Sequence, residues 1–260
     1  MPDIGTGTPI VLIPGLQGRW EWMRPAVDAL AKRHRVITYS LCDEPSSGFT
    51  CDPAKGFDNF VDQLAAVLDR AGLDHAIVAG VSYGGLVAAE FAARHPSRVS
   101  ALVLASALPT DWAPDARARF YMTSPRLLSP FFFATAPGRL NQEVAAALPA
   151  LGARLGFMAR QGMRVASAPA SPALMAQRIR WTEAHDFADP IQVTAPALIV
   201  TGEPGLDRVV PVELTRRYLH TLRSAQHVVL ARTGHLGIVT RPDAFAELVG
   251  RFVDAVRISA

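Results

Sequence analysis

The sequence predicts an α/β fold in which a doubly wound, mostly parallel sheet of about six strands carries an inserted helical cap. Short apolar runs alternate with helical patterns near both ends of the chain, as they do in successive βαβ units. Between residues 110 and 189 this alternation stops, and amphipathic segments rich in Ala, Pro and Arg replace it. We therefore expect a core formed by residues 1–109 and 190–260 and a helical cap formed by residues 110–189.

Continuous apolar runs are typical of strands that are buried on both faces of a parallel sheet. The chain contains Pro9–Pro14, Arg35–Tyr39, His75–Ala79, Val99–Ala105, Ala197–Thr201 and Gln226–Leu230. Only eight residues precede the first run, which is too short for two further strands. The run Arg35–Tyr39 is therefore expected at an unpaired edge, and strand pairing across such an edge would give a homodimer.

Helical patterns lie between these runs. They cover Trp22–Arg33, Phe57–Ala71, Tyr83–Arg94, Pro211–Leu222 and Pro242–Val256, with amphipathic pieces of the expected cap around Arg139–Leu148 and Pro172–Glu183. The last core helix begins close to a capping box, with Pro242 in its first turn. The aromatic cluster Phe131–Phe133 is interpreted either as an anchor that docks the cap onto the core or as a wall of a substrate pocket.

Composition excludes several classes of protein. Half of the residues are apolar and 19% are charged, which suits a large core and not a disordered or fibrous chain. The net charge is +3 with scattered basic residues, so no nucleic-acid partner is expected. No apolar run reaches the roughly 20 residues of a membrane span, and no secretory signal begins at Met1, so a cytoplasmic location is expected by default. Cys42 and Cys51 are expected to be reduced thiols, with a local bridge as the alternative, and no metal site is expected.

The segment Gly80-Val81-Ser82-Tyr83-Gly84 carries the clearest chemical signal. A G-x-S-x-G motif alone occurs by chance in about one chain of this length in ten. Here, however, it joins a buried strand to a helix, which places Ser82 on a sharp turn with its hydroxyl at the carboxyl edge of the sheet. The helix N-terminus that follows favours developing negative charge. Ser82 is therefore the predicted nucleophile.

A serine hydroxyl needs a base to accept its proton, and the base needs a carboxylate to hold its tautomer. The sequence offers seven histidines for this role. Four of them, inside a predicted strand or at helix–strand junctions remote from the catalytic edge, are interpreted as structural, while His185 and His220 have no such placement. The structural group is His34, His75, His95 and His227.

Together with Pro14-Gly15-Leu16, Gly202–Pro211 and Gly234-His235, the serine motif resembles the α/β-hydrolase family, over roughly residues 9–257 outside the cap. The resemblance implies a histidine on the loop after the last strand, where Thr233-Gly234-His235 lies. It also implies the chain order nucleophile, acid, histidine, which Ser82, Asp207 and His235 match. It assigns the oxyanion hole to the backbone N–H groups of Leu16 and Tyr83. Asp111 stands where some members supply the acid and is the alternative to Asp207.

One departure from the family concerns the oxyanion loop. The family usually has His-Gly where this chain has Pro14-Gly15. That histidine supports the geometry of the loop and does not react. The sequence therefore leaves the shape of the oxyanion loop in this protein undecided.

The leading hypothesis is a cofactor-free serine hydrolase that cleaves a carboxylic ester. The same triad could instead cleave a carbon–carbon bond, open a lactone or transfer an acyl group, because a fold does not choose among chemistries. A non-catalytic small-molecule receptor is the third hypothesis.

The expected substrate is a small molecule with an apolar acyl group, because ligand pockets are mostly apolar. We expect the cap to roof this pocket and Trp20 or Trp22 to border it. Alternatively, one cap arginine pairs with a substrate carboxylate, although most should face water. The candidates are Arg117, Arg119, Arg126, Arg154, Arg160, Arg178 and Arg180.

Overall fold

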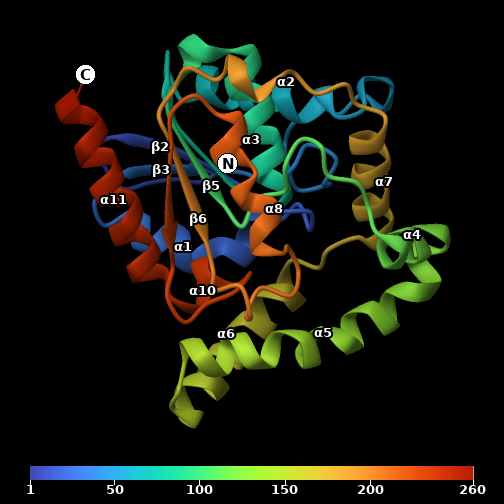
Figure 1. The fold of residues 1–260 in the computed structure, drawn as a ribbon. Helices are drawn as coiled ribbons and strands as arrows, with labels where there is room; N and C mark the ends of the chain where they lie inside the picture. Colours follow the sequence, from blue (N-terminus) through green and yellow to red (C-terminus); the bar gives the residue numbers. More distant parts are fainter. Residues whose placement is uncertain (260) are drawn as a thin grey trace.

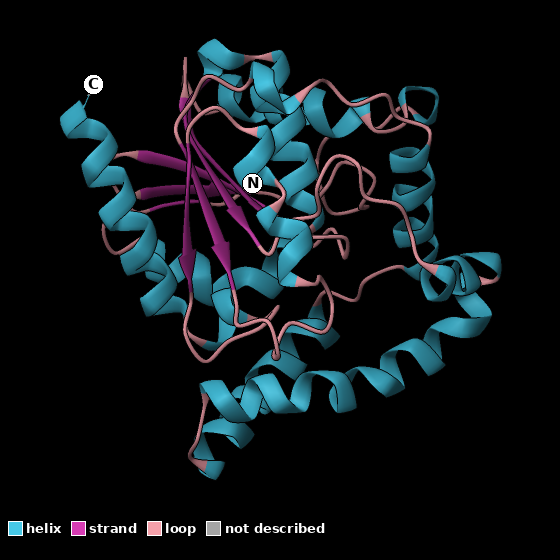
Figure 2. Cartoon of the chain, in the orientation of Figure 1, coloured by secondary structure: helices cyan, strands magenta, loops and turns pink. Residues whose placement is uncertain are grey.

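In a computed structural model of the chain, one seven-stranded sheet runs through the centre of the molecule (Figures 1 and 2). The structure describes the backbone of residues 1–259 and their side chains except those at 129–137, 257 and 259. The sheet order is β1-β3-β2-β4-β5-β6-β7, and every pair after β1 is parallel. The strands are β1 (Asp3–Ile4), β2 (Pro9–Ile13), β3 (Arg35–Thr38), β4 (Ala76–Val81), β5 (Val99–Ala105), β6 (Ala197–Thr201) and β7 (Ala225–Val229). The predicted α/β class and mostly parallel sheet are confirmed.

The edge beside β3 differs from the prediction. The two-residue strand β1 pairs antiparallel with β3, with Asp3 opposite Ile37, and the N–H of Thr38 donates to the Pro2 carbonyl. The guanidinium of Arg35 also pairs with the Asp3 carboxylate at 2.7 Å. The prediction of an unpaired edge is therefore wrong, because a very short strand is enough to cover it. The homodimer stays a prediction that sedimentation equilibrium can test.

Helices cover both faces of the sheet because alternate strand residues point to opposite sides. Ile10 and Leu12 face α1 (Arg24–Leu30) and α11 (Pro242–Ser259), whereas Val11 and Ile13 face the opposite helical layer. That second layer contains α2 (Asp58–Arg70), α3 (Tyr83–Arg94), α8 (Val212–Arg216) and α9 (Tyr218–Thr221). The short helix α10 (Gly237–Thr240) contacts α1 and α11. Four 3₁₀ helices complete the core: η1 (Trp20–Met23), η2 (Pro53–Lys55), η3 (Pro96–Arg98) and η4 (Pro190–Gln192).

Four helices connect β5 to β6. They are α4 (Ala116–Thr123), α5 (Pro125–Ala147), α6 (Leu151–Ser167) and α7 (Pro172–Glu183). In Figure 1, α5 and α6 lie below the ends of the strands, while α4 and α7 lie to the right. We call residues 110–189 the cap. The side chains of Phe131–Phe133 lie outside the described residues, so neither interpretation of that cluster is decided.

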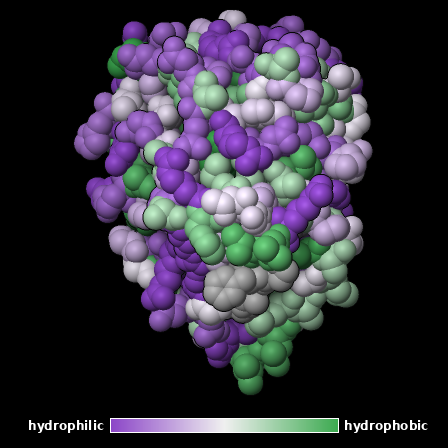
Figure 3. Space-filling model, turned by 90° about the vertical axis from the view of Figure 1, so that its right-hand side faces the viewer, coloured by the Kyte–Doolittle hydropathy of each residue, from purple (hydrophilic) through white to green (hydrophobic). Residues whose placement is uncertain are grey.

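Several apolar side chains of the cap face solvent. They include Phe120, Leu127, Leu151, Leu155, Met158 and Met163, which are 54–79% exposed. Figure 3 shows hydrophobic residues gathered on the lower part of one face, where the cap lies. Within the described part of the chain, no helix is both long and apolar enough to cross a membrane. Cys42 and Cys51 are both free, so the local bridge is absent.

Candidate active site

The turn between β4 and α3 holds Ser82 in a conformation that L-residues seldom adopt. Its backbone angles are φ 54° and ψ −118°, and it immediately precedes the first residue of α3. Such a conformation costs about 1–3 kcal/mol and persists only where its surroundings enforce it. The Ser82 N–H donates to the Ala105 carbonyl at 2.9 Å, and its own carbonyl accepts from Gly85 and Leu108. These bonds to β5, to α3 and to the segment after β5 hold the predicted nucleophile at the carboxyl edge of the sheet.

The glycines of the motif allow the chain to turn this sharply. A Cβ atom on Gly80 would lie 2.2 Å from the Gly84 carbonyl oxygen, and one on Gly84 would lie 2.6 Å from the carbonyl oxygens of Ile13 and Pro14. Both separations are far below a van der Waals contact. The motif therefore needs glycine at these positions so that α3 can start against β4 and against the end of β2.

The loop after β2 brings Leu16 next to this turn. A Cβ atom on Gly15 would lie 3.4 Å from the Cβ atom of Ser82, so the loop passes directly over the serine. The Gly18 N–H donates to the Gly15 carbonyl at 2.9 Å, which closes a tight turn. Tyr83 is the first residue of α3. The structure thus places the two predicted oxyanion residues on either side of Ser82, in the loop before it and in the helix after it.

His235 and Asp207 meet above the ends of β6 and β7. The Nδ1 atom of His235 lies 3.4 Å from Oδ2 of Asp207. This is slightly longer than the usual hydrogen-bond range. The other Asp207 oxygen accepts from the N–H groups of Val209 and Val210, which fixes the carboxylate. The structure therefore brings the predicted acid and base together.

The two loops that carry these residues cross at close range. A Cβ atom on Gly234 would lie 2.4 Å from the Leu206 carbonyl oxygen and 2.7 Å from the Asp207 nitrogen. Only glycine allows this approach, so Gly234 sets the distance between the acid and the base.

Asp207 and His235 each favour the charged form of the other. Burial favours the neutral form of Asp207, but the His235 imidazole and two backbone N–H groups hold the pKa of Asp207 below its ordinary value. Burial opposes the charged form of His235, but the carboxylates of Asp207 and Glu143 hold the pKa of His235 above its ordinary value. This arrangement favours the imidazolium that a general base forms.

Glu143 is a site residue that the sequence analysis missed. It belongs to cap helix α5, is 1% exposed, and accepts a hydrogen bond from the Leu236 N–H, next to His235. Its second carboxyl oxygen is also buried. Burial raises the pKa of Glu143 to about 7. In the sequence, Glu143 follows Leu140 by three residues and precedes Ala147 by four, which places its carboxyl on the apolar face of a helix. This spacing was the sequence signal that could have identified Glu143.

The alternative acid and the remaining histidines lie elsewhere. Asp111 is 66% exposed and pairs with Arg217 at 2.8 Å. His227 hydrogen-bonds Thr201 across β6 and β7, and His185 bonds Glu90. Among the described contacts, none of these groups touches His235.

The two tryptophans predicted at the pocket border hold neighbouring structure. The Trp22 indole donates to the Ala168 carbonyl at 2.8 Å, and the Trp22 carbonyl accepts from Gln161 of α6. Trp20 lies beneath the Arg24 guanidinium, 5.8 Å from its ring centroid. Trp22 therefore ties the cap to the core, and contact of either ring with substrate stays a prediction.

Arg178 is a cap arginine whose side chain points into the protein. Its side chain is 0% exposed and binds Asp43 and Glu44 at 2.7 and 2.6 Å. Both carboxylates belong to the core, so this guanidinium is already neutralised. Arg178 therefore does not serve as a free partner for a substrate carboxylate.

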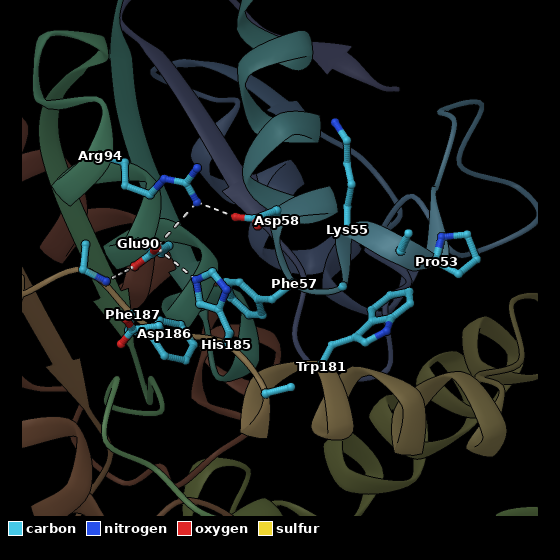
Figure 4. Close-up of a pocket in the computed structure, with 14 residues that line it drawn as sticks. Pro53, Lys55, Phe57, Asp58, Glu90, Arg94, Trp181, His185, Asp186 and Phe187 are labelled. Carbon is cyan, nitrogen blue, oxygen red and sulfur yellow. Dashed lines mark hydrogen bonds and ion pairs between the residues drawn. The ribbon is translucent and has the colours of Figure 1, made fainter.

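A surface pocket of about 660 Å³ lies between the end of the cap and the core, and Ser82 is not among the residues that line it (Figure 4). Trp181, Phe57 and His185 line it, and its buried carboxylate, Glu90, is held by His185 and by the Ala188 N–H. These contacts anchor the segment by which the cap returns to the core. None of the predicted catalytic or oxyanion residues lines this pocket. Within the described residues, no cluster of three or more His, Cys, Asp or Glu side chains is arranged to hold a metal.

Comparison with known proteins gives consistent matches along the chain. A family model described as the alpha/beta hydrolase fold matches residues 8–242. A 2-hydroxy-6-oxo-2,4-heptadienoate hydrolase of Pseudomonas putida is 30% identical over 97% of this chain and 91% of its own length. A pimeloyl-[acyl-carrier protein] methyl ester esterase of Aeromonas hydrophila is 27% identical over 96% of both chains.

The fold also matches solved structures. A bromoperoxidase from Bacillus anthracis superposes with a TM-score of 0.78, covering 97% of this chain and 94% of that one at 23% identity. At this identity the likeness concerns the fold alone.

The strain at Ser82 gives a prediction about stability. Ser82→Gly should be more stable than Ser82→Ala by about 1 kcal/mol, because glycine adopts a positive φ without cost whereas alanine keeps the strain. Urea unfolding monitored by circular dichroism measures the difference. Equal stability of the two variants would mean that the turn is not strained.

The contact of Glu143 with the His235 loop gives a prediction about pH. Glu143→Gln removes a carboxylate that raises the pKa of His235, so the acidic limb of kcat/KM should move to lower pH. The cap variant Glu183→Gln, whose carboxylate pairs with Arg119 instead, is the control.

Glu143 also affects stability. Its folded pKa of about 7 lies above the ordinary 4.5, so the folded state holds its proton more tightly and wild-type stability falls as pH rises through this window. Glu143→Gln should lack this fall. An unchanged acidic limb together with an unchanged stability profile would contradict both expectations.

Proposed function

Because the chain belongs to the α/β-hydrolase family and its reaction class is hydrolysis, we propose that it is a cofactor-independent serine hydrolase that cleaves a carboxylic ester. Ser82 is the proposed nucleophile, His235 the general base and acid, and Asp207 the group that orients His235. Three observations support the proposal: the Ser82 turn lies beside the Leu16 loop, His235 lies beside Asp207, and all of these segments follow parallel strands of one sheet.

The first half of the reaction forms an acyl-enzyme. His235 accepts the Ser82 proton while the hydroxyl oxygen attacks the ester carbonyl carbon. The carbonyl oxygen becomes an oxyanion, which the N–H groups of Leu16 and Tyr83 stabilise. The tetrahedral intermediate then collapses, the bond to the alcohol breaks, and His235 returns the proton to the leaving oxygen.

The second half releases the acid. His235 now accepts a proton from water, whose oxygen attacks the acyl carbon through the same oxyanion hole. Collapse expels the Ser82 oxygen, which regains its proton from His235. Asp207 stays ionised throughout and stabilises the imidazolium in both halves, in keeping with its lowered pKa.

Charge at the site favours a neutral substrate. The cap residue that contacts the His235 loop is a carboxyl, Glu143, and the buried cap guanidinium of Arg178 is taken up by Asp43 and Glu44. A substrate carboxylate near His235 would also lie near the carboxyl groups of Asp207 and Glu143. Arg178 would not offset this repulsion, because its charge is already paired. We therefore propose an ester with an apolar, uncharged acyl group.

Carbon–carbon bond hydrolysis is the second candidate. It is favoured by the full-length relative whose name describes a 6-oxo-heptadienoate substrate. Such a compound contains no ester bond, so its hydrolysis breaks a bond between carbons. The same nucleophile, base and oxyanion hole would act on its ketone carbonyl.

The triad assignment predicts a characteristic pattern of losses. Ser82→Ala and His235→Ala should each lower kcat by about 10⁴, and the double variant should be little worse, because triad members act as a unit. Asp207→Asn should also cost about 10⁴, while Asp111→Asn should change little. Steady-state kinetics with a chromogenic ester measures all five proteins. If Asp111→Asn caused the large loss and Asp207→Asn changed little, the acid of the triad would be Asp111.

The substrate proposal is tested with matched series of substrates. For neutral esters, each added acyl methylene should contribute about 0.8 kcal/mol, or about fourfold in kcat/KM, until the pocket is filled. Half-esters of equal length with a free carboxylate should react more slowly. Preference for a 2-hydroxy-6-oxo-dienoate over every neutral ester would favour the carbon–carbon bond candidate instead.

A further inference from the structure

Arg178 connects the cap to both residues of the proposed oxyanion hole. It lies on α7, and its side chain is fully buried. Burying a guanidinium is unfavourable unless its N–H groups are paired. Arg178 meets this requirement with Asp43, Glu44 and the backbone of the Leu16 loop, and each of these contacts fixes a different segment.

The carboxylate contacts fix the guanidinium itself. Nε and Nη2 donate to the two oxygens of Asp43 at 2.9 and 2.7 Å, and Nη2 also donates to Glu44 at 2.6 Å. Arg19 lies 3.7 Å from the second Glu44 oxygen. These carboxylates hold the planar guanidinium at two of its nitrogens and fix its orientation, which a lysine ammonium would not reproduce.

The fourth contact reaches the oxyanion loop. Nη1 donates to the Leu16 carbonyl at 2.6 Å. The guanidinium also lies against Gly18, where a Cβ atom would come within 2.4 Å of Nη1. Gly18 has φ 74°, and its N–H holds the Gly15 carbonyl.

These bonds determine the direction of the Leu16 N–H. In a trans peptide the N–H points opposite to the carbonyl of the preceding residue. The Gly15 carbonyl is turned toward Gly18, so the Leu16 N–H points the other way. The next peptide contains the Leu16 carbonyl, which Arg178 fixes. Because the peptides before and after Leu16 are both held, the backbone of Leu16 cannot rotate.

The same residue holds the second donor. The Tyr83 hydroxyl donates to the Arg178 carbonyl at 3.3 Å. The Thr182 hydroxyl lies 3.2 Å from the Tyr83 hydroxyl and 3.0 Å from the Arg178 carbonyl. The start of α3, where Tyr83 presents its N–H, is therefore bound to the same turn of α7.

We infer that Arg178 is a positioning residue for the oxyanion hole, which it holds in shape by fixing the Leu16 loop against α7 and by balancing the buried charges of Asp43 and Glu44. The inference rests on the proposed function, in which Leu16 and Tyr83 stabilise the oxyanion. It assigns to a cap residue a role in transition-state stabilisation without contact with substrate.

The test compares Arg178→Lys and Arg178→Gln with matched variants of Arg180, an exposed arginine of the same helix. Each protein is assayed for kcat and KM with a neutral chromogenic ester and for inhibition by a trifluoromethyl ketone, which forms a tetrahedral adduct with the serine. Arg178→Gln should lower kcat by about 10²-fold and Arg178→Lys by about tenfold, with KM nearly unchanged. Affinity for the ketone should fall by the same factor, because it reports transition-state complementarity.

Hydrogen exchange separates failure of this inference from failure of the proposed function. Exchange of the amides at residues 15–18 should be faster in Arg178→Lys than in Arg180→Lys, whatever the substrate. Ser82→Ala, assayed in parallel, decides whether the ester is hydrolysed by the proposed site at all. If Arg178→Gln does not fold, Asp43→Asn should give a smaller loss of kcat in the same direction.

The inference is overturned if Arg178→Lys keeps kcat and ketone affinity within about threefold of the Arg180→Lys values, well short of the loss expected for a displaced donor. A loss confined to KM, or unchanged amide exchange at residues 15–18, would also overturn it.

Discussion

The backbone at Ser82 is the constraint around which the site is built. A residue at φ 54° is unfavourable in an isolated chain, so the surrounding structure must supply the energy to keep it there. The carbonyl of β5 and the N–H groups of Gly85 and Leu108 do so. Because these groups belong to neighbouring parts of the core, the turn exists only when β4, β5 and α3 are packed together.

The parallel sheet makes this concentration of loops possible. The segments after β2, β4, β6 and β7 all leave the same edge, so four distant stretches of sequence meet there. Each meeting is close enough to require glycine on one side, as at Gly84 beside the end of β2 and at Gly234 beside Asp207. The chemical residues therefore depend on small residues that do no chemistry themselves.

The cap also contacts the loops that carry the candidate site residues. Two of its buried charged groups reach the core at different places, with Arg178 on the Leu16 loop and Glu143 on the His235 loop. The first lies among carboxylates that neutralise it, whereas the second lies beside backbone N–H groups of the His235 loop. The cap is thus bound to the Leu16 loop, which carries a proposed oxyanion donor, through Arg178 and its carboxylate partners. It contacts the loop of His235, the proposed base, through a carboxyl whose charge depends on pH.

The local sequence determined the elements and the order of the chemistry. Periodicity located β5, β6 and α3 to the residue and α7 approximately, because continuous apolar runs and helical patterns are local signals. The motif at Gly80–Gly84 and the loops at Asp207 and His235 were visible for the same reason. Each needs particular residues at neighbouring positions, and the structure brings Asp207 and His235 into contact.

Tertiary structure alone decided the rest. The strand β1 has two residues and no periodicity of its own, so only its pairing with β3 defines it. Arg178 resembles the other arginines of the cap in sequence, yet it is buried because Asp43 and Glu44, more than 130 residues away, are there to compensate its charge. Glu143 is likewise distinguished by the Leu236 N–H across the interface between cap and core. Partners of this kind are set by packing between distant segments, and the local sequence around a charged residue does not contain them.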